Sequence, residues 1–304
     1  MTNTHHPIDP SDVAAMAALR AFLAANPIPM TRASYDQILE QIPDFPGVQY
    51  ERAVVGGVPG VWCRPPVARA NASLLYFHGG VYVFGSAWAY RHFVGQLAAC
   101  AGVSAFAADY RLAPEHRFPA AIEDARAAFN ALPGSVSVAG DSAGAALALG
   151  LLAERTRRPA AGVLLSPWTD LALSGESLVT RAAEDPLLSR QALQLGVTEY
   201  LHGQTALDPL ASPLYADLSS LPPVQVHVGT AEVLLDDSLR LAERANVDLH
   251  VWEGMPHTFL RNVRTMLAAR AALDLAGQFI ADLDRLRSWP SRRPSGSPPY
   301  RQRP

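Results

Sequence analysis

Lysine is absent from this chain of 304 residues, in which all 25 basic residues are arginine. Without lysine there is no side-chain amine to form a Schiff base, to anchor pyridoxal phosphate or to complete a Walker-type phosphate loop. The sequence therefore excludes these three chemistries.

Cysteine and long apolar runs are also scarce. The two cysteines, Cys63 and Cys100, form neither a C-x-x-C pair nor a disulfide framework, which is typical of a reducing compartment. The apolar stretches are far shorter than the ~18 residues that cross a bilayer, and the N-terminus lacks the basic and apolar regions of a secretory leader. We expect a cytoplasmic protein without a membrane span.

Neither sign of charge is in large excess. The chain has 28 acidic and 25 basic residues, which gives a formal net charge of −3. Basic residues are locally in excess only at the C-terminus. This balance argues against nucleic acid or an anionic membrane as a partner.

Short β-rich runs alternate with helical segments along most of the chain. Two runs at 48–55 and 60–64 flank a Gly-Gly-Val-Pro turn and predict a hairpin. The alternation that follows predicts a mostly parallel sheet with helices on both faces. The other predicted strands are 73–77, 103–108, 136–139, 162–165, 224–228 and 249–252, and the predicted helices are 10–25, 34–41, 88–101, 119–132, 142–155, 189–200 and 234–245.

Residues 173–212 interrupt this alternation. An insertion at this point lies above the carboxyl edge of the sheet, where open α/β folds bind ligands. We expect it to form a cap with residues 1–45, above a catalytic domain at 46–287. The Pro-, Ser- and Arg-rich residues 288–304 predict a disordered tail.

The segment Gly140-Asp141-Ser142-Ala143-Gly144 joins a predicted strand to an Ala- and Leu-rich helix. Gly-x-Ser-x-Gly in this context is the pattern of a nucleophile elbow, in which a strained turn exposes the serine hydroxyl. The two glycines remove side chains where the strand and the helix approach each other. Ser142 is therefore the candidate nucleophile.

A serine nucleophile needs donors for the oxyanion that forms during attack. His78-Gly79-Gly80-Val81 follows a predicted strand, and backbone N–H groups of Gly79 and Gly80 can point into a site there. The N–H of Ala143, directly after the serine, supplies a third donor. An ordinary glycine-rich turn is the competing interpretation, but the order of the two motifs favours an oxyanion hole.

His257 is the preferred base among nine histidines. It follows the last predicted strand and comes after the serine, in the chain order serine, acid, histidine of this type of site. The other histidines lie in connections, on a helix, within strands or at the N-terminus, where we expect His5 and His6 to be frayed.

Glu232 is the preferred orienting acid, because it is the first carboxylate after the strand at 224–228. Asp236 and Asp237 follow one turn later and remain alternatives. A charge that merely favours a helix N-terminus is the competing interpretation of Glu232.

Further motifs resemble the hormone-sensitive-lipase branch of the α/β-hydrolases, a group of bacterial esterases and acetylhydrolases. The resemblance spans about residues 45–285. Besides the two glycine motifs, it is carried by Gly85-Ser86, Asp109-Tyr110-Arg111-Leu112-Ala113-Pro114-Glu115-His116, Phe118-Pro119-Ala120-Ala121, Glu123-Asp124, Ser166-Pro167-Trp168-Thr169-Asp170-Leu171, Asp208-Pro209, Ser212-Pro213 and Pro256-His257.

The resemblance implies an α/β-hydrolase fold with a mostly parallel, eight-stranded sheet under a helical cap. It also implies Ser142 as nucleophile, His257 as base and an oxyanion hole of Gly79, Gly80 and Ala143, with no metal and no cofactor.

Three positions depart from the family pattern. Val81 replaces the last glycine of His-Gly-Gly-Gly, and Glu232 begins an acid motif in which aspartate is usual. Thr258 replaces the glycine after the histidine, which we expect to be tolerated with a negative φ at this residue.

Together these residues predict hydrolysis of short- to medium-chain carboxylic esters through an acyl-enzyme, with a small-molecule ester as partner. Amide cleavage or metabolite deacetylation at the same triad is the alternative, followed by a non-catalytic binding protein. Whether the chain forms a homodimer stays open. Candidates for an apolar substrate pocket, equally compatible with core packing, are Val81, Tyr82, Phe84, Trp88 and Trp168.

Overall fold

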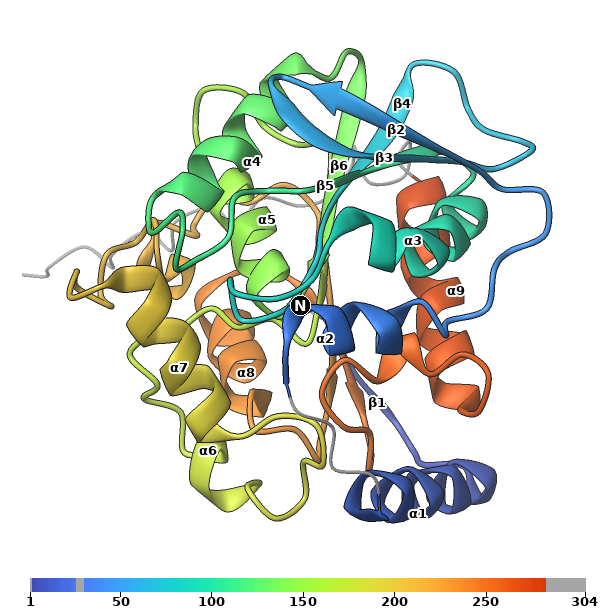
Figure 1. Cartoon of the computed structure of the whole chain (residues 1–304), viewed down its shortest axis with the longest axis vertical. Helices are drawn as coiled ribbons and strands as arrows, with labels where there is room; N and C mark the ends of the chain where they lie inside the picture. Colours follow the sequence, from blue (N-terminus) through green and yellow to red (C-terminus); the bar gives the residue numbers. More distant parts are fainter. Residues whose placement is uncertain (1, 26–29, 283–304) are drawn as a thin grey trace, which may run out of the picture.

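A nine-stranded sheet forms the centre of the computed structural model, which describes residues 2–25 and 30–282 (Figure 1). The strand order is β1-β9-β8-β7-β6-β4-β5-β3-β2. Neighbouring strands are parallel except around β3, which is antiparallel to both β2 and β5. The strands are β1 (Thr2–His6), β2 (Gln49–Val55), β3 (Val58–Arg64), β4 (Ala72–Phe77), β5 (Ser104–Ala108), β6 (Ser135–Asp141), β7 (Gly162–Leu165), β8 (Val224–Gly229) and β9 (Asp248–Trp252).

Helices cover both faces of this sheet, as the alternating pattern predicts (Figure 1). On one face α3 (Ala87–Ala101) and α9 (Leu267–Ala281) bury apolar residues against the strands. On the other face α4 (Ala120–Ala131), α5 (Ala143–Ala153) and α8 (Leu235–Arg244) enclose a second core. The predicted fold class is therefore confirmed, and the predicted tail at 288–304 lies outside the described residues.

The sheet has one strand more than the eight predicted. The additional strand is β1, which pairs in parallel with β9. The ring of His6 stacks on Trp252 with centroids 3.8 Å apart, and His6 Nε2 lies 2.8 Å from His250 Nδ1. The expectation of a frayed terminus at His5 and His6 is wrong because their partners lie at the far end of the sequence.

The inserted segment contacts both the N-terminal helix and the body of the protein. Arg20 of α1 donates hydrogen bonds to the carbonyls of Ala183 and Glu184 in this segment. The Phe118 N–H donates to the Tyr200 carbonyl at 2.9 Å. The cap of residues 1–45 and 173–212, and the domain boundaries that go with it, stay a prediction. The remaining helices are α1 (Pro10–Ala25), α2 (Arg32–Leu39), α6 (Ser177–Thr180), α7 (Arg190–Leu201), and the 3-10 turns η1 (Pro213–Tyr215) and η2 (Phe259–Arg261).

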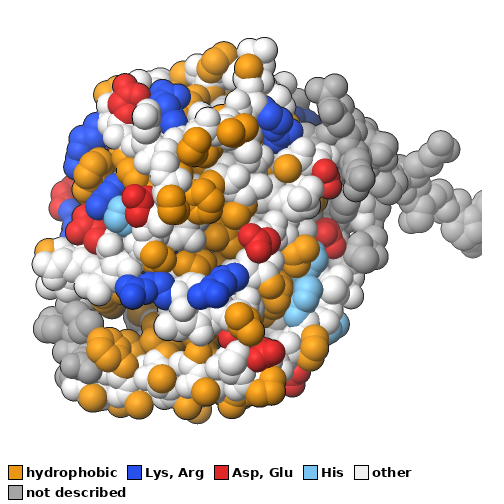
Figure 2. Space-filling model, turned by 90° about the vertical axis from the view of Figure 1, so that its right-hand side faces the viewer, with side chains coloured by type: hydrophobic (Ala, Val, Ile, Leu, Met, Phe, Trp, Pro, Cys, Tyr) orange, Lys and Arg blue, Asp and Glu red, His pale blue; other side chains and the backbone are white. Residues whose placement is uncertain are grey.

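The face that carries α3 and α9 shows apolar, basic and acidic side chains interspersed, without a broad area of one charge among its described residues (Figure 2). This distribution agrees with the small net charge of −3. Within 2–25 and 30–282, no helix is both long enough and apolar enough to traverse a bilayer.

Candidate active site

The turn between β6 and α5 holds Ser142 in an unusual backbone conformation. Its φ is 54° and its ψ is −120°, a region that costs a residue with a side chain about 1–3 kcal/mol. Two backbone hydrogen bonds hold the turn: the Ser142 N–H donates to the Leu165 carbonyl at 3.0 Å, and the Trp168 N–H donates to the Ser142 carbonyl at 3.1 Å. The strand β7 and the loop after it therefore fix the serine.

Close backbone approaches require the two glycines of the elbow. A Cβ at Gly140 would lie 2.4 Å from the backbone of Gly144, and a Cβ at Gly144 would lie 2.0 Å from the Phe77 carbonyl oxygen. Any side chain at either position would force β4, β6 and α5 apart. Glycine thus permits the tight strand-to-helix turn that the sequence motif predicts.

The structure brings Glu232 and His257 together at the same edge of the sheet. Glu232 follows β8 and His257 follows the neighbouring β9, and His257 Nδ1 lies 2.9 Å from Glu232 Oε2. The other carboxylate oxygen, Oε1, accepts hydrogen bonds from the Gly229 N–H at 2.6 Å and the Ser166 hydroxyl at 3.0 Å. Burial raises the pKa of Glu232, while its hydrogen bond with His257 and the charge of that residue oppose the rise.

The two alternative acids have other partners. Asp236 Oδ2 accepts a hydrogen bond from the Ser177 N–H at 2.8 Å. Asp237 Oδ2 accepts from the N–H groups of Thr169 at 2.6 Å and Asp170 at 2.9 Å, and burial raises the pKa of Asp237 to about 7. Asp237 therefore braces the loop after β7 and Asp236 the start of α6, whereas Glu232 contacts the histidine.

The loop after β4 differs from the expectation at one glycine. The Gly79 N–H donates to Asp141 Oδ1 at 2.9 Å, so its prediction as an oxyanion donor is wrong: this N–H already has an acceptor. By contrast, the N–H groups of Gly80, Val81 and Ala143 have no hydrogen-bond acceptor within the described part of the chain. Ala143 is also the first residue of α5, where the helix dipole favours a negative charge.

Thr258 corrects a second expectation, because its φ is +52° rather than negative. Its N–H donates to the Ser166 hydroxyl at 3.0 Å, and its own hydroxyl donates to the His257 carbonyl at 2.8 Å. These bonds hold a β-branched residue in a backbone region that glycine usually occupies. They fix the turn immediately after the histidine.

Three of the predicted pocket residues pack against α7. Val81, Tyr82 and Trp168 are all buried. The ring of Tyr82 stacks on Tyr200 with centroids 3.9 Å apart. A Cβ at Gly196 of α7 would lie 2.8 Å from Val81 Cβ and 3.2 Å from the ring of Trp168.

The other two pocket candidates lie in different surroundings. Phe84 is half-buried, and its ring lies 5.9 Å from that of Tyr35 on α2. Two guanidinium groups lie over the ring of Trp88, that of Arg52 at 4.3 Å and that of Arg91 at 4.4 Å from the ring centroid. Trp88 therefore makes cation–π contacts with β2 and with its own helix, α3.

Ser166 and Asp141 also belong to the site, although the sequence motifs alone did not indicate their roles. Ser166 bridges Glu232 and Thr258, as described above. Asp141 is 1% exposed and accepts hydrogen bonds from Tyr76 and Tyr90 as well as from Gly79. Both residues stand in recognisable motifs, but their partners come from strands and helices far away in the sequence.

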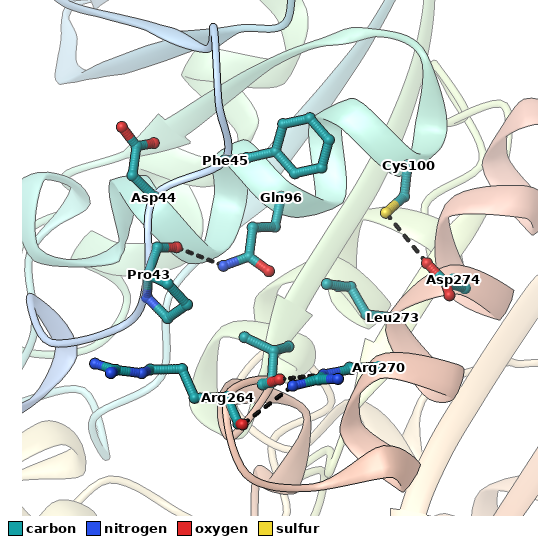
Figure 3. A pocket seen from close by; sticks show the side chains of 10 residues that line it. Pro43, Asp44, Phe45, Gln96, Cys100, Arg264, Arg270, Leu273 and Asp274 are labelled. Carbon is teal, nitrogen blue, oxygen red and sulfur yellow. Dashed lines mark hydrogen bonds between the residues drawn. The ribbon is translucent and has the colours of Figure 1, made fainter.

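A separate cavity of about 330 Å³ lies between residues 43–45, α3 and α9 (Figure 3). Phe45 and Leu273 form apolar parts of its wall, and Gln96 and Arg264 form polar parts. Its lining includes neither the elbow residues nor Glu232 or His257, although Val263 and Arg264 come from the far end of the connection that carries His257. Within the described residues, no group of three or more His, Cys, Asp or Glu side chains is placed to hold a metal ion.

Comparison with known proteins agrees with this geometry. The family model for the alpha/beta hydrolase fold matches residues 74–261. The chain belongs to the α/β-hydrolase family. This α/β-hydrolase is 38% identical over 264 residues to an acetyl-hydrolase of Streptomyces hygroscopicus, and the aligned region covers 82% of this chain and 88% of that protein. It is 36% identical over 271 residues to an esterase of Acinetobacter venetianus, covering 83% of this chain and 88% of that protein.

A solved structure places this α/β-hydrolase more narrowly. The crystal structure of an esterase from the bacterial hormone-sensitive lipase family matches it with a TM-score of 0.83 and 38% identity, over 90% of this chain and 98% of the other. The branch that the sequence motifs resemble is thereby confirmed.

Proposed function

We propose that this α/β-hydrolase is a serine carboxylesterase that hydrolyses short- to medium-chain carboxylic esters through an acyl-enzyme. The observation that carries the proposal is the 2.9 Å pairing of His257 Nδ1 with the buried carboxylate of Glu232, at the sheet edge that also presents the elbow serine. The esterase and acetyl-hydrolase relatives support the same activity.

In the proposed first step, the Ser142 oxygen attacks the ester carbonyl carbon while His257 Nε2 takes the hydroxyl proton. Glu232 accepts the Nδ1–H bond, which fixes the tautomer with a free Nε2 lone pair. The bond to the alcohol then breaks, and the alcohol leaves with the proton from His257. Water repeats the sequence on acyl-Ser142, which releases the carboxylic acid and restores the serine. The two steps return every proton and bond of the enzyme to its starting state without a metal or a cofactor.

The proposed oxyanion donors are the N–H groups of Gly80, Val81 and Ala143. Each lacks an acceptor among the described residues and lies in a loop or helix start adjoining the serine. Donors already aimed at the developing charge lower the barrier by about 3–4 kcal/mol each, because no reorganisation accompanies the reaction.

The proposed walls of the substrate pocket are Val81, Tyr82, Phe84 and Trp168, which are apolar or aromatic and lie in the loops after β4 and β7. Trp88 is not among these walls, because two guanidinium groups lie over its ring. An acetyl-hydrolase among the relatives favours short acyl groups.

Turnover of p-nitrophenyl acetate and butyrate tests the function directly. We expect hydrolysis by the wild-type protein, strong loss in Ser142→Ala, and lower kcat/KM for a long-chain ester. Turnover of matched anilides in preference to esters would indicate the amidase alternative. Folded wild-type protein that turns over no short ester would overturn the esterase proposal and favour a binding protein.

Two finer points belong to the proposal. Cys63 and Cys100 are both free thiols, which supports the expected cytoplasmic location. The homodimer is a proposal that light scattering on the purified chain tests.

A further inference from the structure

Arg261, in the turn η2 four residues after His257, has an unusual environment for an arginine. Its side chain is 17% exposed, and the carboxylate that faces it, Asp141, has Oδ2 4.0 Å from Nη1. Nη1 instead donates to the hydroxyls of Tyr90 at 3.0 Å and Tyr35 at 3.2 Å. Nη2 donates to the Thr258 hydroxyl. The guanidinium therefore joins three separate parts of the protein.

The first of these parts is the nucleophile elbow and its neighbouring oxyanion loop. Asp141 directly precedes Ser142, and its Oδ1 accepts the Gly79 N–H at 2.9 Å. Its Oδ2 accepts the Tyr90 hydroxyl at 3.0 Å, and the same hydroxyl accepts from Arg261. A buried carboxylate needs such hydrogen bonds and a compensating cation. Arg261 is the cation that faces Asp141, and the Tyr90 hydroxyl lies between the two as a hydrogen-bonded bridge.

The second part is the loop that carries the base. The Thr258 hydroxyl that contacts Arg261 also bonds the His257 carbonyl, and the Thr258 N–H bonds Ser166. Because Thr258 has a positive φ, its conformation persists only while these partners hold it. The guanidinium thus contributes to the placement of the imidazole.

The third part is the N-terminal cap segment. Tyr35 lies on α2, and its hydroxyl is 3.0 Å from that of Tyr90 and 3.2 Å from Arg261 Nη1. Docking of α2 therefore completes the hydrogen bonds around the guanidinium.

We propose that Arg261 is a positioning residue of the ester-hydrolysing site. It ties the His257 loop, the Asp141 carboxylate and the cap helix α2 into one arrangement, so that the base and the oxyanion donors are aligned with Ser142 while the cap is docked. This inference rests on the proposed function at Ser142.

The test compares Arg261→Met, which removes the donors, with Arg261→Lys, which keeps the charge. Arg264→Met is the matched control, since Arg264 lies in the same loop and is exposed. Steady-state turnover of p-nitrophenyl butyrate is normalised to the serine that a fluorophosphonate labels at completion. For Arg261→Met we expect kcat to fall about 100-fold with KM changed less than about threefold, because misplaced reacting groups lose rate more than binding. Arg261→Lys should recover part of kcat, and Arg264→Met should match the wild type.

A merely structural arginine would lower the amount of labelled protein or its Tm, but not kcat per labelled serine. That outcome, or a wild-type kcat in Arg261→Met, overturns the inference while the esterase proposal stands. If Arg261→Met does not fold, Tyr35→Phe takes its place in the test, because it removes only the hydroxyl that α2 contributes. Unchanged kcat per labelled serine in both Tyr35→Phe and Arg261→Lys then overturns the inference. If wild type turns over no ester but is labelled, the labelling rates of the same variants replace kcat. If wild type is neither active nor labelled, both proposals fail.

Discussion

Backbone strain is concentrated at the residues around Ser142. Five of the eight non-glycine residues with positive φ in the described part of the chain belong to the elbow and its neighbouring loops. Each such conformation costs about 1–3 kcal/mol and persists only where surrounding bonds enforce it. We therefore expect changes to the residues that hold these loops to reduce activity before they unfold the protein. The five residues are Val81, Tyr82, Ser142, Ser166 and Thr258.

Glu232→Gln tests the acid. A glutamine can place its NH2 group toward His257 Nδ1 and favour the wrong tautomer, so we expect kcat to fall by a factor on the order of 10³–10⁴ with the fold retained. Asp236→Asn is the matched control and should lose much less, because Asp236 contacts Ser177 and not the histidine. The measurement is kcat on p-nitrophenyl butyrate with circular dichroism of each variant. A crippled Asp236→Asn beside an active Glu232→Gln would reverse the assignment.

Asp237 should make stability depend on pH. Its pKa in the folded protein is about 7 against an ordinary 3.8, so the folded state holds this proton more tightly than the unfolded state does. As pH rises from about 4 to about 7, Asp237 ionises in the unfolded chain but keeps its proton in the folded protein. The free energy of unfolding therefore falls, by about 4 kcal/mol at most. Asp237→Asn removes this contribution. Urea unfolding should show the variant gaining on the wild type as pH rises, and a difference that is constant with pH would contradict the prediction.

Residue types and positions along the chain were enough to select Glu232 and His257, which the structure pairs, because each follows a recognisable strand. The same reasoning selects Ser142, whose role as nucleophile stays a prediction. The acceptor of the Gly79 N–H and the φ of Thr258 were not predictable. Both depend on side chains, Asp141 and Ser166, whose orientation is set by contacts across neighbouring strands. A motif specifies which residue stands in a turn, but not which partner the turn meets.

At the scale of elements, α7 and the loop after β4 fit each other closely. The last glycine of the usual family motif is Val81 here, and α7 has a glycine, Gly196, where a Cβ would lie 2.8 Å from Val81 Cβ. The missing side chain on the helix makes room for the added side chain on the loop.

Gly196→Ala tests this fit, because two effects predict opposite signs. Helix propensity alone favours alanine by about 1 kcal/mol. The contact with Val81 instead requires α7 or the loop to move, and we expect kcat to fall about tenfold through displaced oxyanion donors. The exposed neighbour Leu195→Ala serves as control. A higher Tm with full activity in Gly196→Ala would show that α7 moves away from Val81 without displacing the oxyanion donors, and would contradict the prediction.

Besides the short α6, η1 and η2, the elements β1 and α9 lie outside the sequence-based prediction. The reason is the same for both, since each is completed by residues distant in the chain. The first N–H groups of α9, those of Leu267 and Ala268, bond to the carboxylate of Asp12 at 2.7 and 2.9 Å. No local capping residue marks the start of this helix, so a local pattern does not reveal it.

At the scale of the whole molecule, the alternating pattern was sufficient for the fold class and for the edge of the sheet where the site lies. Parallel strands with helical crossovers bring the ends of β6, β8 and β9 to one side, whatever the details of packing. The number of strands was not predictable, because β1 is short, polar and held by stacking of His6 on Trp252.

The pairing of β1 with β9 has a consequence for synthesis on the ribosome. Residues 2–25 emerge before the other described elements, yet the strand that pairs with β1 and the helix whose start Asp12 completes are among the last described elements to be made. His6 and its partner His250 are 244 positions apart. β1 and the Asp12 carboxylate must therefore wait without these partners until the sheet is almost finished, and the time for which they stay exposed to proteases and chaperones depends on the rate of translation.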